Sequence, residues 1–305
     1  MKLRLGLSTC PNDTFAFHAI LERRIDLRGL EFEPELLDVQ QLNDGLFAGR
    51  YDVSKASFHA ALLLASDYGV VRAGSALGFG VGPLLVAARP DVHPGPNARV
   101  LCPGRTTTAT LLYRCLHPDG GAIDHAVFSD IGAVLRRGDA DLGVLIHEGR
   151  LTYERDGLVL IEDLGASFER LAQAPIPLGG ILAGLALPDD VVERFTAVLR
   201  DSIAYGWANR DEVLGTIRRY TQELGEDVIW PYVELYVTEH TVDLGDNGIR
   251  ALETLERTAA AAGALPAGTA PLRVVGPASE PAGAARPAEN GRRTTAPAGS
   301  AARLR

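Results

Sequence analysis

A run of three threonines after a Pro-Gly turn is the most distinctive chemical feature of this sequence. Residues 99–112 read as a strand, a turn at Pro103 and Gly104, threonines at 106–108, and then an apolar helix. Unpaired amides at a helix N-terminus attract carboxylate or phosphate groups, and threonine hydroxyls add donors. A plain helix cap needs only one threonine. The run therefore favours an anion-binding site, although it lacks the Gly-Lys-Ser/Thr element of a nucleotide-binding P-loop.

A similar turn opens the chain. Residues 8–15 read Ser-Thr-Cys-Pro-Asn-Asp-Thr-Phe between a predicted strand and a predicted helix. Asn12 or Asp13 could cap that helix, and this structural interpretation is favoured for either residue alone. Cys10 could form an activated thiolate near the helix N-terminus, but the sequence shows no general base beside it. The sequence therefore does not favour a nucleophilic cysteine.

Polar residues end another predicted strand, in the segment 52–59 with the sequence Asp-Val-Ser-Lys-Ala-Ser-Phe-His. Such residues at the carboxyl end of a strand usually face the ligand crevice of an open α/β sheet. Lys55 could pair with a substrate carboxylate or with Asp52, and the sequence leaves both pairings open. The only other lysine in the chain is Lys2, so Lys55 stands out among basic residues that are otherwise arginines.

A histidine follows a further buried strand. Residues 142–146 are apolar, and His147-Glu148-Gly149-Arg150 come directly after them. A lone histidine is usually structural, but here the imidazole falls at the carboxyl end of a strand. Because imidazole titrates near neutral pH, His147 is a candidate general base. Glu148 could be its partner, although neighbouring strand residues point to opposite faces.

Metal and dinucleotide sites are not indicated. No cluster of His, Cys and Asp residues has the spacing of metal ligands, and we expect no bound metal. The three cysteines, at 10, 102 and 115, are an odd count at unrelated spacings, which argues against a disulfide framework. The glycine-rich segment 78–82 is not followed by a helical pattern, so it does not match a dinucleotide-binding fingerprint.

The bulk composition limits the class of partner. The chain has 305 residues, of which 46% are hydrophobic and 23% charged, which is typical of a globular protein. Its formal net charge of −9 argues against nucleic acid as a partner, while a small anionic ligand could still bind through local donors. The first eight residues alternate like a strand rather than a signal peptide, and no apolar run approaches the roughly 20 residues of a membrane span. We therefore expect a cytoplasmic protein without a membrane partner.

Strand and helix patterns alternate along the chain and predict an α/β fold, with mainly parallel sheets and helices on both faces. The N-terminal elements are strands at 3–7, 30–36 and 52–57, with helices at 14–24 and 39–48. A helix, a Gly-x-x-Asp turn and a strand recur at 42–53 and 131–142. This weak repeat predicts two similar lobes, and chance similarity between βαβ units is the alternative.

Two strands are predicted to connect the lobes, one at 82–88 leaving the first and one at 175–183 returning to it. The division that follows is 1–88 with 182–275 for lobe one, and 89–181 for lobe two. Two crossings form a hinge, and the cleft between the lobes is the expected binding site.

The composition changes after residue 275. Residues 276–305 are rich in Ala, Pro and Gly and have almost no large apolar side chains. Such a segment cannot bury enough surface to offset its ordering entropy, so we expect a disordered tail. A basic docking tail is the alternative.

Taken together, these motifs resemble the 1,4-dihydroxy-6-naphthoate synthases of the futalosine route to menaquinone. The resembling segments are 8–15, 49–59, 82–86, 103–109, 146–153 and 177–180, in the family's order, and the likeness covers residues 1–262. As a set the motifs are specific, although any one alone is weak. Two positions depart from the usual family pattern, Thr106 and the Thr9 of the Ser-Thr-Cys-Pro opening.

The resemblance implies a two-lobed periplasmic-binding-protein-like fold of the second type, adapted to catalysis in the cytoplasm. It implies a lyase that cleaves cyclic dehypoxanthinyl futalosine and releases 1,4-dihydroxy-6-naphthoate, with no metal or organic cofactor. By matching motif, His147 would be the proton acceptor. The residues that would line the substrate site are Lys55, Ala56, Ser57, Thr108 and Ala109.

Two other functions would use the same fold. One is a binding protein for a small carboxylate, which the strand-like N-terminus and the placement of His147 argue against. The other is the chorismate dehydratase of the same route, and the His-Glu-Gly-Arg motif favours the synthase over it. The sequence does not determine an oligomeric state.

Overall fold

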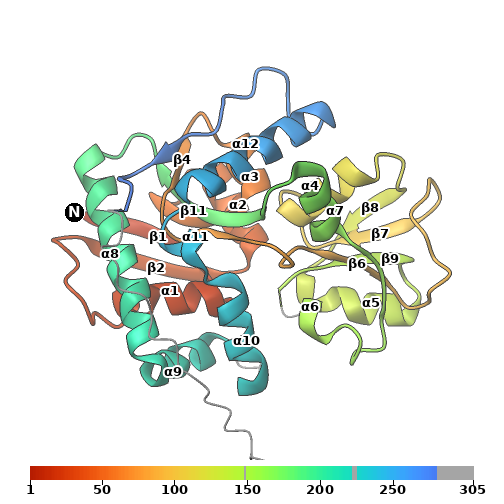
Figure 1. The fold of residues 1–305 in the computed structure, drawn as a ribbon, viewed down its shortest axis with the longest axis horizontal. Coiled ribbons are helices and arrows are strands. Elements are labelled where there is room, and N and C mark those ends of the chain that lie inside the picture. Colours follow the sequence, from red (N-terminus) through yellow and green to blue (C-terminus); the bar gives the residue numbers. More distant parts are fainter. Residues whose placement is uncertain (148, 222–224, 280–305) are drawn as a thin grey trace, which may run out of the picture.

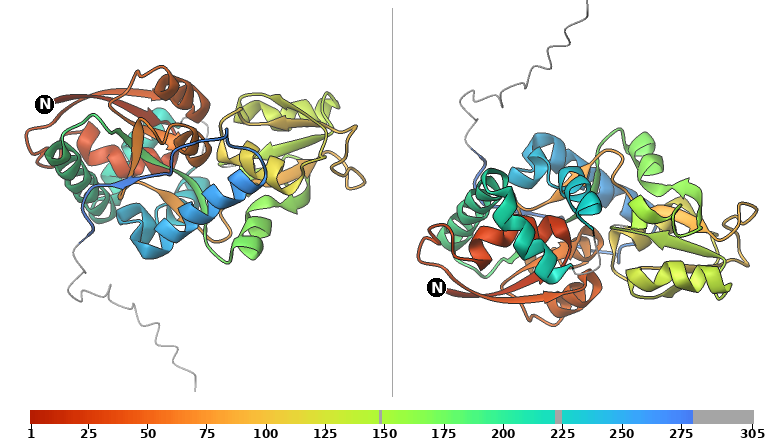
Figure 2. Two further views of the ribbon diagram at one scale, coloured as in Figure 1. Left: turned by 90° about the horizontal axis from the view of Figure 1, so that it is seen from above. Right: turned by 90° about the horizontal axis from the view of Figure 1, so that it is seen from below.

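The computed structural model describes residues 1–147, 149–221 and 225–279. Within them the chain forms two α/β lobes, each built around its own sheet (Figure 1). The lobes lie side by side along the long axis of the molecule, and Figure 2 shows this division from two other directions. None of the described helices is both long and apolar enough to cross a lipid bilayer. Glu148 and residues 280–305, for which the sequence makes predictions, lie outside the described residues.

The larger lobe is built on a mixed seven-stranded sheet in the order β12-β4-β11-β3-β1-β2, with β5 paired to β11. Its strands are β1 (Lys2–Ser8), β2 (Glu31–Leu37), β3 (Val53–Ser57), β4 (Tyr68–Val71), β5 (Ala76–Gly78), β11 (Ile176–Gly184) and β12 (Val274–Val275). Strand β1 pairs in parallel with β2 and β3, whereas β11 runs antiparallel to β3, β4 and β5. The antiparallel strand is the one that returns from the other lobe.

Helices cover both faces of this sheet because its strands are apolar on both sides. Neighbouring residues of β11 show this, since Ile181 packs into one buried cluster and Leu182 into another. The helices of this lobe are α1 (Pro11–Leu21), α2 (Val39–Phe47), α3 (Phe58–Leu63), α8 (Asp189–Ala208), α9 (Arg210–Tyr220), α10 (Glu226–Tyr236), α11 (Glu239–Val242) and α12 (Gly245–Ala261). Helices α1, α8 and α9 supply the first cluster, α2, α3 and α12 the second, and α10 contributes to both.

The smaller lobe is built on a five-stranded sheet in the order β10-β6-β9-β7-β8. Its elements are β6 (Leu84–Ala87), β7 (Arg99–Cys102), α4 (Thr108–Leu116), β8 (Ala122–His125), a 3-10 turn (Phe128–Asp130), α5 (Ile131–Arg137), β9 (Leu142–Leu145), α6 (Gly149–Thr152), β10 (Val159–Asp163) and α7 (Leu164–Ala172). Strand β7 is parallel to β8 and β9, and β6 is antiparallel to β9 and β10. Apolar side chains again cover both faces, with Leu85 and Val86 in different buried clusters.

The sheets divide the chain at points that differ from the predicted ones. The prediction assigns residues up to 88 to the larger lobe, but β6 pairs with β9 and β10 in the smaller sheet. It assigns residues up to 181 to the smaller lobe, but β11 belongs to the larger sheet from Ile176 onward. An apolar run shows that a strand is buried but not which sheet buries it. The chain therefore crosses between the lobes just before β6 and just before β11.

Two glycines allow the backbones to meet at the first crossing. A Cβ on Gly82 would lie 2.2 Å from the Cα of Gly165, at the start of α7. A side chain at either position would push these segments apart, so the close approach requires glycine.

The chain after β12 contacts the larger lobe as far as it is described. The Ser279 amide donates to Asp243 Oδ2 at 2.6 Å, and Arg200 donates to the Pro277 carbonyl at 2.8 Å. The predicted start of the disordered tail at residue 276 therefore falls within a segment that has tertiary contacts.

Candidate active site

One cavity, of about 80 Å³, is lined by residues of both lobes. Every site residue predicted from the sequence lies in its wall. These residues are Lys55, Ala56 and Ser57 from the larger lobe, and Thr108, Ala109 and His147 from the smaller one. Other residues in its wall include Asn12, Asp13, Thr107, Gly179, Tyr232 and Tyr236. Small-molecule sites usually measure about 300–1,000 Å³, so this cavity is smaller than a typical site.

Threonine hydroxyls shape the turn that precedes α4. Thr107 caps the helix, because its Oγ1 accepts a hydrogen bond from the Thr110 amide at 3.3 Å. Both Thr107 Oγ1 and Thr110 Oγ1 donate to the Gly104 carbonyl, at 2.9 and 2.6 Å. Gly104 has a φ of +134°, and a Cβ there would lie 2.5 Å from Gln40 Oε1. These two hydroxyls therefore hold the loop in shape, and glycine is required within it.

The first amides of α4 are the anion-binding feature of this wall. Thr108 and Ala109 begin the helix, where backbone amides have no acceptor within the helix and the helix dipole is positive. The Thr108 hydroxyl does not add a free donor, because its Oγ1 donates to the Leu178 carbonyl of β11 at 2.6 Å. An anion at this wall would therefore be held chiefly by backbone amides.

Residues of α2 connect Ser57 to this loop across the lobes. Asn43 is fully buried, its Oδ1 accepts from the Ser57 amide at 3.1 Å, and its Nδ2 donates to Ser57 Oγ at 3.3 Å. The same Nδ2 donates to the Thr106 carbonyl at 3.4 Å. Gln40 Oε1 accepts from the Thr106 amide at 3.0 Å. Sequence reasoning missed Asn43 and Gln40, because nothing distinguishes them from other polar residues of a helix.

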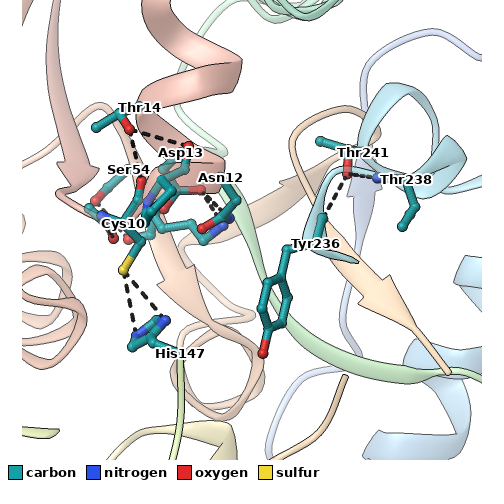
Figure 3. Close-up of polar contacts among 12 residues, drawn as sticks. Cys10, Asn12, Asp13, Thr14, Ser54, His147, Tyr236, Thr238 and Thr241 are labelled. Atoms are coloured by element: carbon teal, nitrogen blue, oxygen red, sulfur yellow. Dashed lines mark hydrogen bonds and ion pairs between the residues drawn. The ribbon is translucent and has the colours of Figure 1, made fainter. Parts of the chain in front are cut away.

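His147 lies where residues from three parts of the chain converge. It follows β9 with a φ of +55°, a left-handed conformation that is uncommon for residues other than glycine. Its Nδ1 is 2.9 Å from Tyr232 Oη, and Cys10 Sγ lies 3.4 Å from Nδ1 and 3.6 Å from Nε2. The Phe128 ring packs edge-on at 4.9 Å between ring centroids. Figure 3 shows Cys10 between the start of α1 and the imidazole.

This arrangement suits the imidazole to proton transfer. When Nδ1–H donates to Tyr232 Oη, Nε2 retains the lone pair that a general base needs. Sequence reasoning found no base near Cys10 and did not identify Tyr232. Both contacts join residues more than 80 positions apart, so no local pattern could reveal them.

Lys55 pairs with a carboxylate that the sequence did not suggest. Its Nζ lies 2.6 Å from Asp13 Oδ1, and both side chains are buried, at 8% and 4% exposure. The alternative pairing with Asp52 is wrong, because Asp52 binds Arg4 at 2.7 Å. Asp52 lies one residue before β3, whereas Lys55 lies within that strand.

His59 lies outside the cavity wall. Burial lowers the pKa of His59 to about 4, so the ring is neutral at physiological pH. Its Nδ1 is 3.3 Å from the Thr107 carbonyl, to which a neutral ring can donate. His59 thus supports the loop before α4 rather than lining the cavity. Across the residues that the structure describes, no group of three or more His, Cys, Asp and Glu side chains could hold a metal ion.

Comparison with known proteins identifies the relatives of this chain. A family model described as menaquinone biosynthesis matches residues 3–261. A 1,4-dihydroxy-6-naphthoate synthase of Thermus thermophilus is 39% identical over 272 residues, which are 89% of this chain and 99% of that protein. A protein of the same name from Streptomyces coelicolor is 33% identical over 270 residues, covering 87% and 95%.

Solved structures agree on the fold. Protein AF1704 from Archaeoglobus fulgidus superposes with a TM-score of 0.82 at 31% identity, covering 87% of this chain and 98% of that one. The periplasmic aliphatic sulphonate-binding protein SsuA of Escherichia coli superposes with a TM-score of 0.60 at 14% identity, covering 96% and 98%. At that identity the second likeness shows the fold alone. The predicted two-lobed, periplasmic-binding-protein-like fold is confirmed.

Proposed function

The chain belongs to the menaquinone biosynthesis family, and we propose that it is a 1,4-dihydroxy-6-naphthoate synthase. It is an enzyme, since the two similar synthases match it over nearly their whole length. The proposed reaction is the cleavage of cyclic dehypoxanthinyl futalosine, a small anionic aromatic substrate, by a lyase without a metal or organic cofactor. We place the enzyme in the cytoplasm, with the rest of this biosynthetic route.

One observation carries the proposal beyond the family: a single cavity combines an anion-binding helix start with a candidate base. The substrate carboxylate fits the amides of Thr108 and Ala109, and Ser57 lines the same cavity. His147 supports proton abstraction from a substrate hydroxyl, the step that starts the fragmentation. Because the product is aromatic, its formation supplies driving force.

The test is direct turnover. Purified protein is mixed with cyclic dehypoxanthinyl futalosine, and the naphthoate product is followed by its fluorescence and by mass spectrometry. A parallel sample is first treated with EDTA, which should not change the rate. Absence of product from folded protein would contradict the proposal.

The same assay separates the rival functions. Conversion of chorismate instead of the cyclic substrate would indicate the dehydratase. Tight binding of a small carboxylate without any conversion would indicate a binding protein.

A further inference from the structure

The buried ion pair in the cavity wall has hydrogen-bonding capacity that the described residues leave unused. Asp13 Oδ1 accepts from both Lys55 Nζ, at 2.6 Å, and Asn12 Nδ2, at 3.0 Å. The other carboxylate oxygen, Oδ2, is buried and has no donor among the described residues. Lys55 Nζ can donate three hydrogen bonds, and within the described part of the chain it makes one. All three residues line the cavity.

An unsatisfied carboxylate oxygen in a buried site is costly to the fold. Buried polar atoms nearly always have hydrogen-bond partners, and exceptions call for an explanation. Asp13 is 3% exposed and Lys55 is 6% exposed, so bulk water does not surround either group. A ligand that enters the cavity could supply the missing donor to Asp13 and use the spare donors of Lys55.

We propose that Asp13 and Lys55 together bind a hydroxyl group of the substrate. A hydroxyl donates one hydrogen bond and accepts others, so it can satisfy Asp13 Oδ2 and Lys55 Nζ at once. A carboxylate would be repelled by Asp13, and an ammonium group would be repelled by Lys55. This chemistry assigns the substrate carboxylate to the start of α4 and a neutral hydroxyl to the start of α1. The assignment rests on the proposed function, whose substrate carries both kinds of group.

Asp13 at the start of α1 and Lys55 on β3 place this hydroxyl subsite in the same cavity as the candidate base. Asp13 lies one helical turn from Cys10, and Cys10 Sγ is 3.4 Å from His147 Nδ1. Figure 3 shows Asn12 and Asp13 on the far side of Cys10 from the imidazole. The hydroxylated end of the substrate would therefore lie in the cavity that His147 also lines, with Cys10 between the subsite and the imidazole.

The experiment compares two ligands by calorimetry, 1,4-dihydroxy-6-naphthoate and 2-naphthoate. They share the ring system and the carboxylate, and only the first carries hydroxyls. Wild-type protein should bind the dihydroxy ligand at least about 10-fold more tightly, as expected for hydrogen bonds to charged groups. Asp13→Asn should lose most of this preference. The control Asp52→Asn, a carboxylate paired with Arg4 outside the cavity, should keep it.

Asp13→Asn leaves Lys55 as an unpaired buried charge, so this variant could fail to fold. A second variant keeps the test decisive in that case. The double variant Asp13→Asn, Lys55→Gln removes both charges and should also lose the preference. Equal binding of the two ligands by wild-type protein would overturn the subsite, as would an undiminished preference in a folded variant. A wild-type preference without turnover of the cyclic substrate would instead contradict the proposed function and leave the subsite standing.

Discussion

Thr108 belongs at once to the fold and to the cavity wall. Its hydroxyl joins α4 of the smaller lobe to the Leu178 carbonyl in the larger sheet, at 2.6 Å. The hydrogen bond therefore fixes where the first amides of α4 lie relative to the larger lobe. Thr108 should therefore contribute to substrate binding by positioning those amides.

Replacing Thr108 by Val should raise KM more than it lowers kcat. The hydroxyl contributes one hydrogen bond, worth about 1 kcal/mol, or about 5-fold in KM. Thr108→Ser keeps the hydroxyl and should stay close to wild type. Steady-state kinetics on both variants tests this. A drop in kcat at constant KM would mean that Thr108 acts in the chemical step instead.

Protonation of His59 should lower the free energy of unfolding at acid pH. Burial lowers the pKa of His59 to about 4 in the folded state, against an ordinary value of 6.5. The unfolded chain therefore binds the proton first, and the stabilisation present above pH 6.5 is lost as pH falls toward 4. The loss should reach about 3 kcal/mol at pH 4.

Urea unfolding of wild type and His59→Asn between pH 7 and pH 4 measures this loss of stability. Asparagine retains a donor for the Thr107 carbonyl but does not titrate. The stability difference between the two proteins should therefore narrow as the pH falls. A difference that stays constant over the whole range would show that His59 is not the titrating group.

The crossing before β6 depends on two glycines that face each other, Gly82 and Gly165. Gly82→Ala should destabilise the protein by about 1–3 kcal/mol, because the new methyl group would clash with the backbone of Gly165. Gly95→Ala is the matched control, since a Cβ there meets nothing within 4 Å. Thermal unfolding of both variants tests this prediction. Equal melting temperatures of the two variants would show that Gly82→Ala causes no clash.

The sequence predicted local elements well where periodicity and turn signals agree. The predicted strand at 30–36 and helix at 39–48 correspond to β2 (Glu31–Leu37) and α2 (Val39–Phe47). The sequence predicts the first helix at 14–24, because Cys-Pro-Asn-Asp reads as a turn. It begins at Pro11, because proline fits the first turn of a helix, where no amide partner is needed.

Pairings between distant segments could not be predicted in this way. Motif matching placed His147 and Thr108 in one site, and the structure brings both to one cavity. Motif matching does not identify Tyr232 or Asn43. These residues reach the site from helices whose sequence patterns indicate only which face is buried. Sheet membership of β6 was missed for the same reason, since hydrophobicity does not identify a partner strand.

Truncation at the C-terminus tests where the fold ends. Truncation after Ser279 should leave the melting temperature unchanged, because the composition beyond it cannot contribute to a core. Truncation after Arg273 removes β12, its pairing with β4, and the contacts to Asp243 and Arg200.

The second truncation should cost more than about 1 kcal/mol, or at least about 2 °C in melting temperature. Calorimetry on the two truncated proteins and the full chain provides the comparison. A large drop in the melting temperature of the protein truncated after Ser279 would show that residues 280–305 dock on the folded lobes. That outcome would favour the alternative of a docking tail.

We expect His147 to act as the base in the cavity that both lobes line. The most direct measurement is turnover of cyclic dehypoxanthinyl futalosine by His147→Gln, with His147→Asn as a second variant that tolerates the left-handed backbone. Turnover should fall by about 10²–10⁴-fold in both variants, while product affinity changes little because the carboxylate end is held by α4. Near-wild-type turnover by a folded variant would contradict the claim and move the base to Asp13 or Cys10.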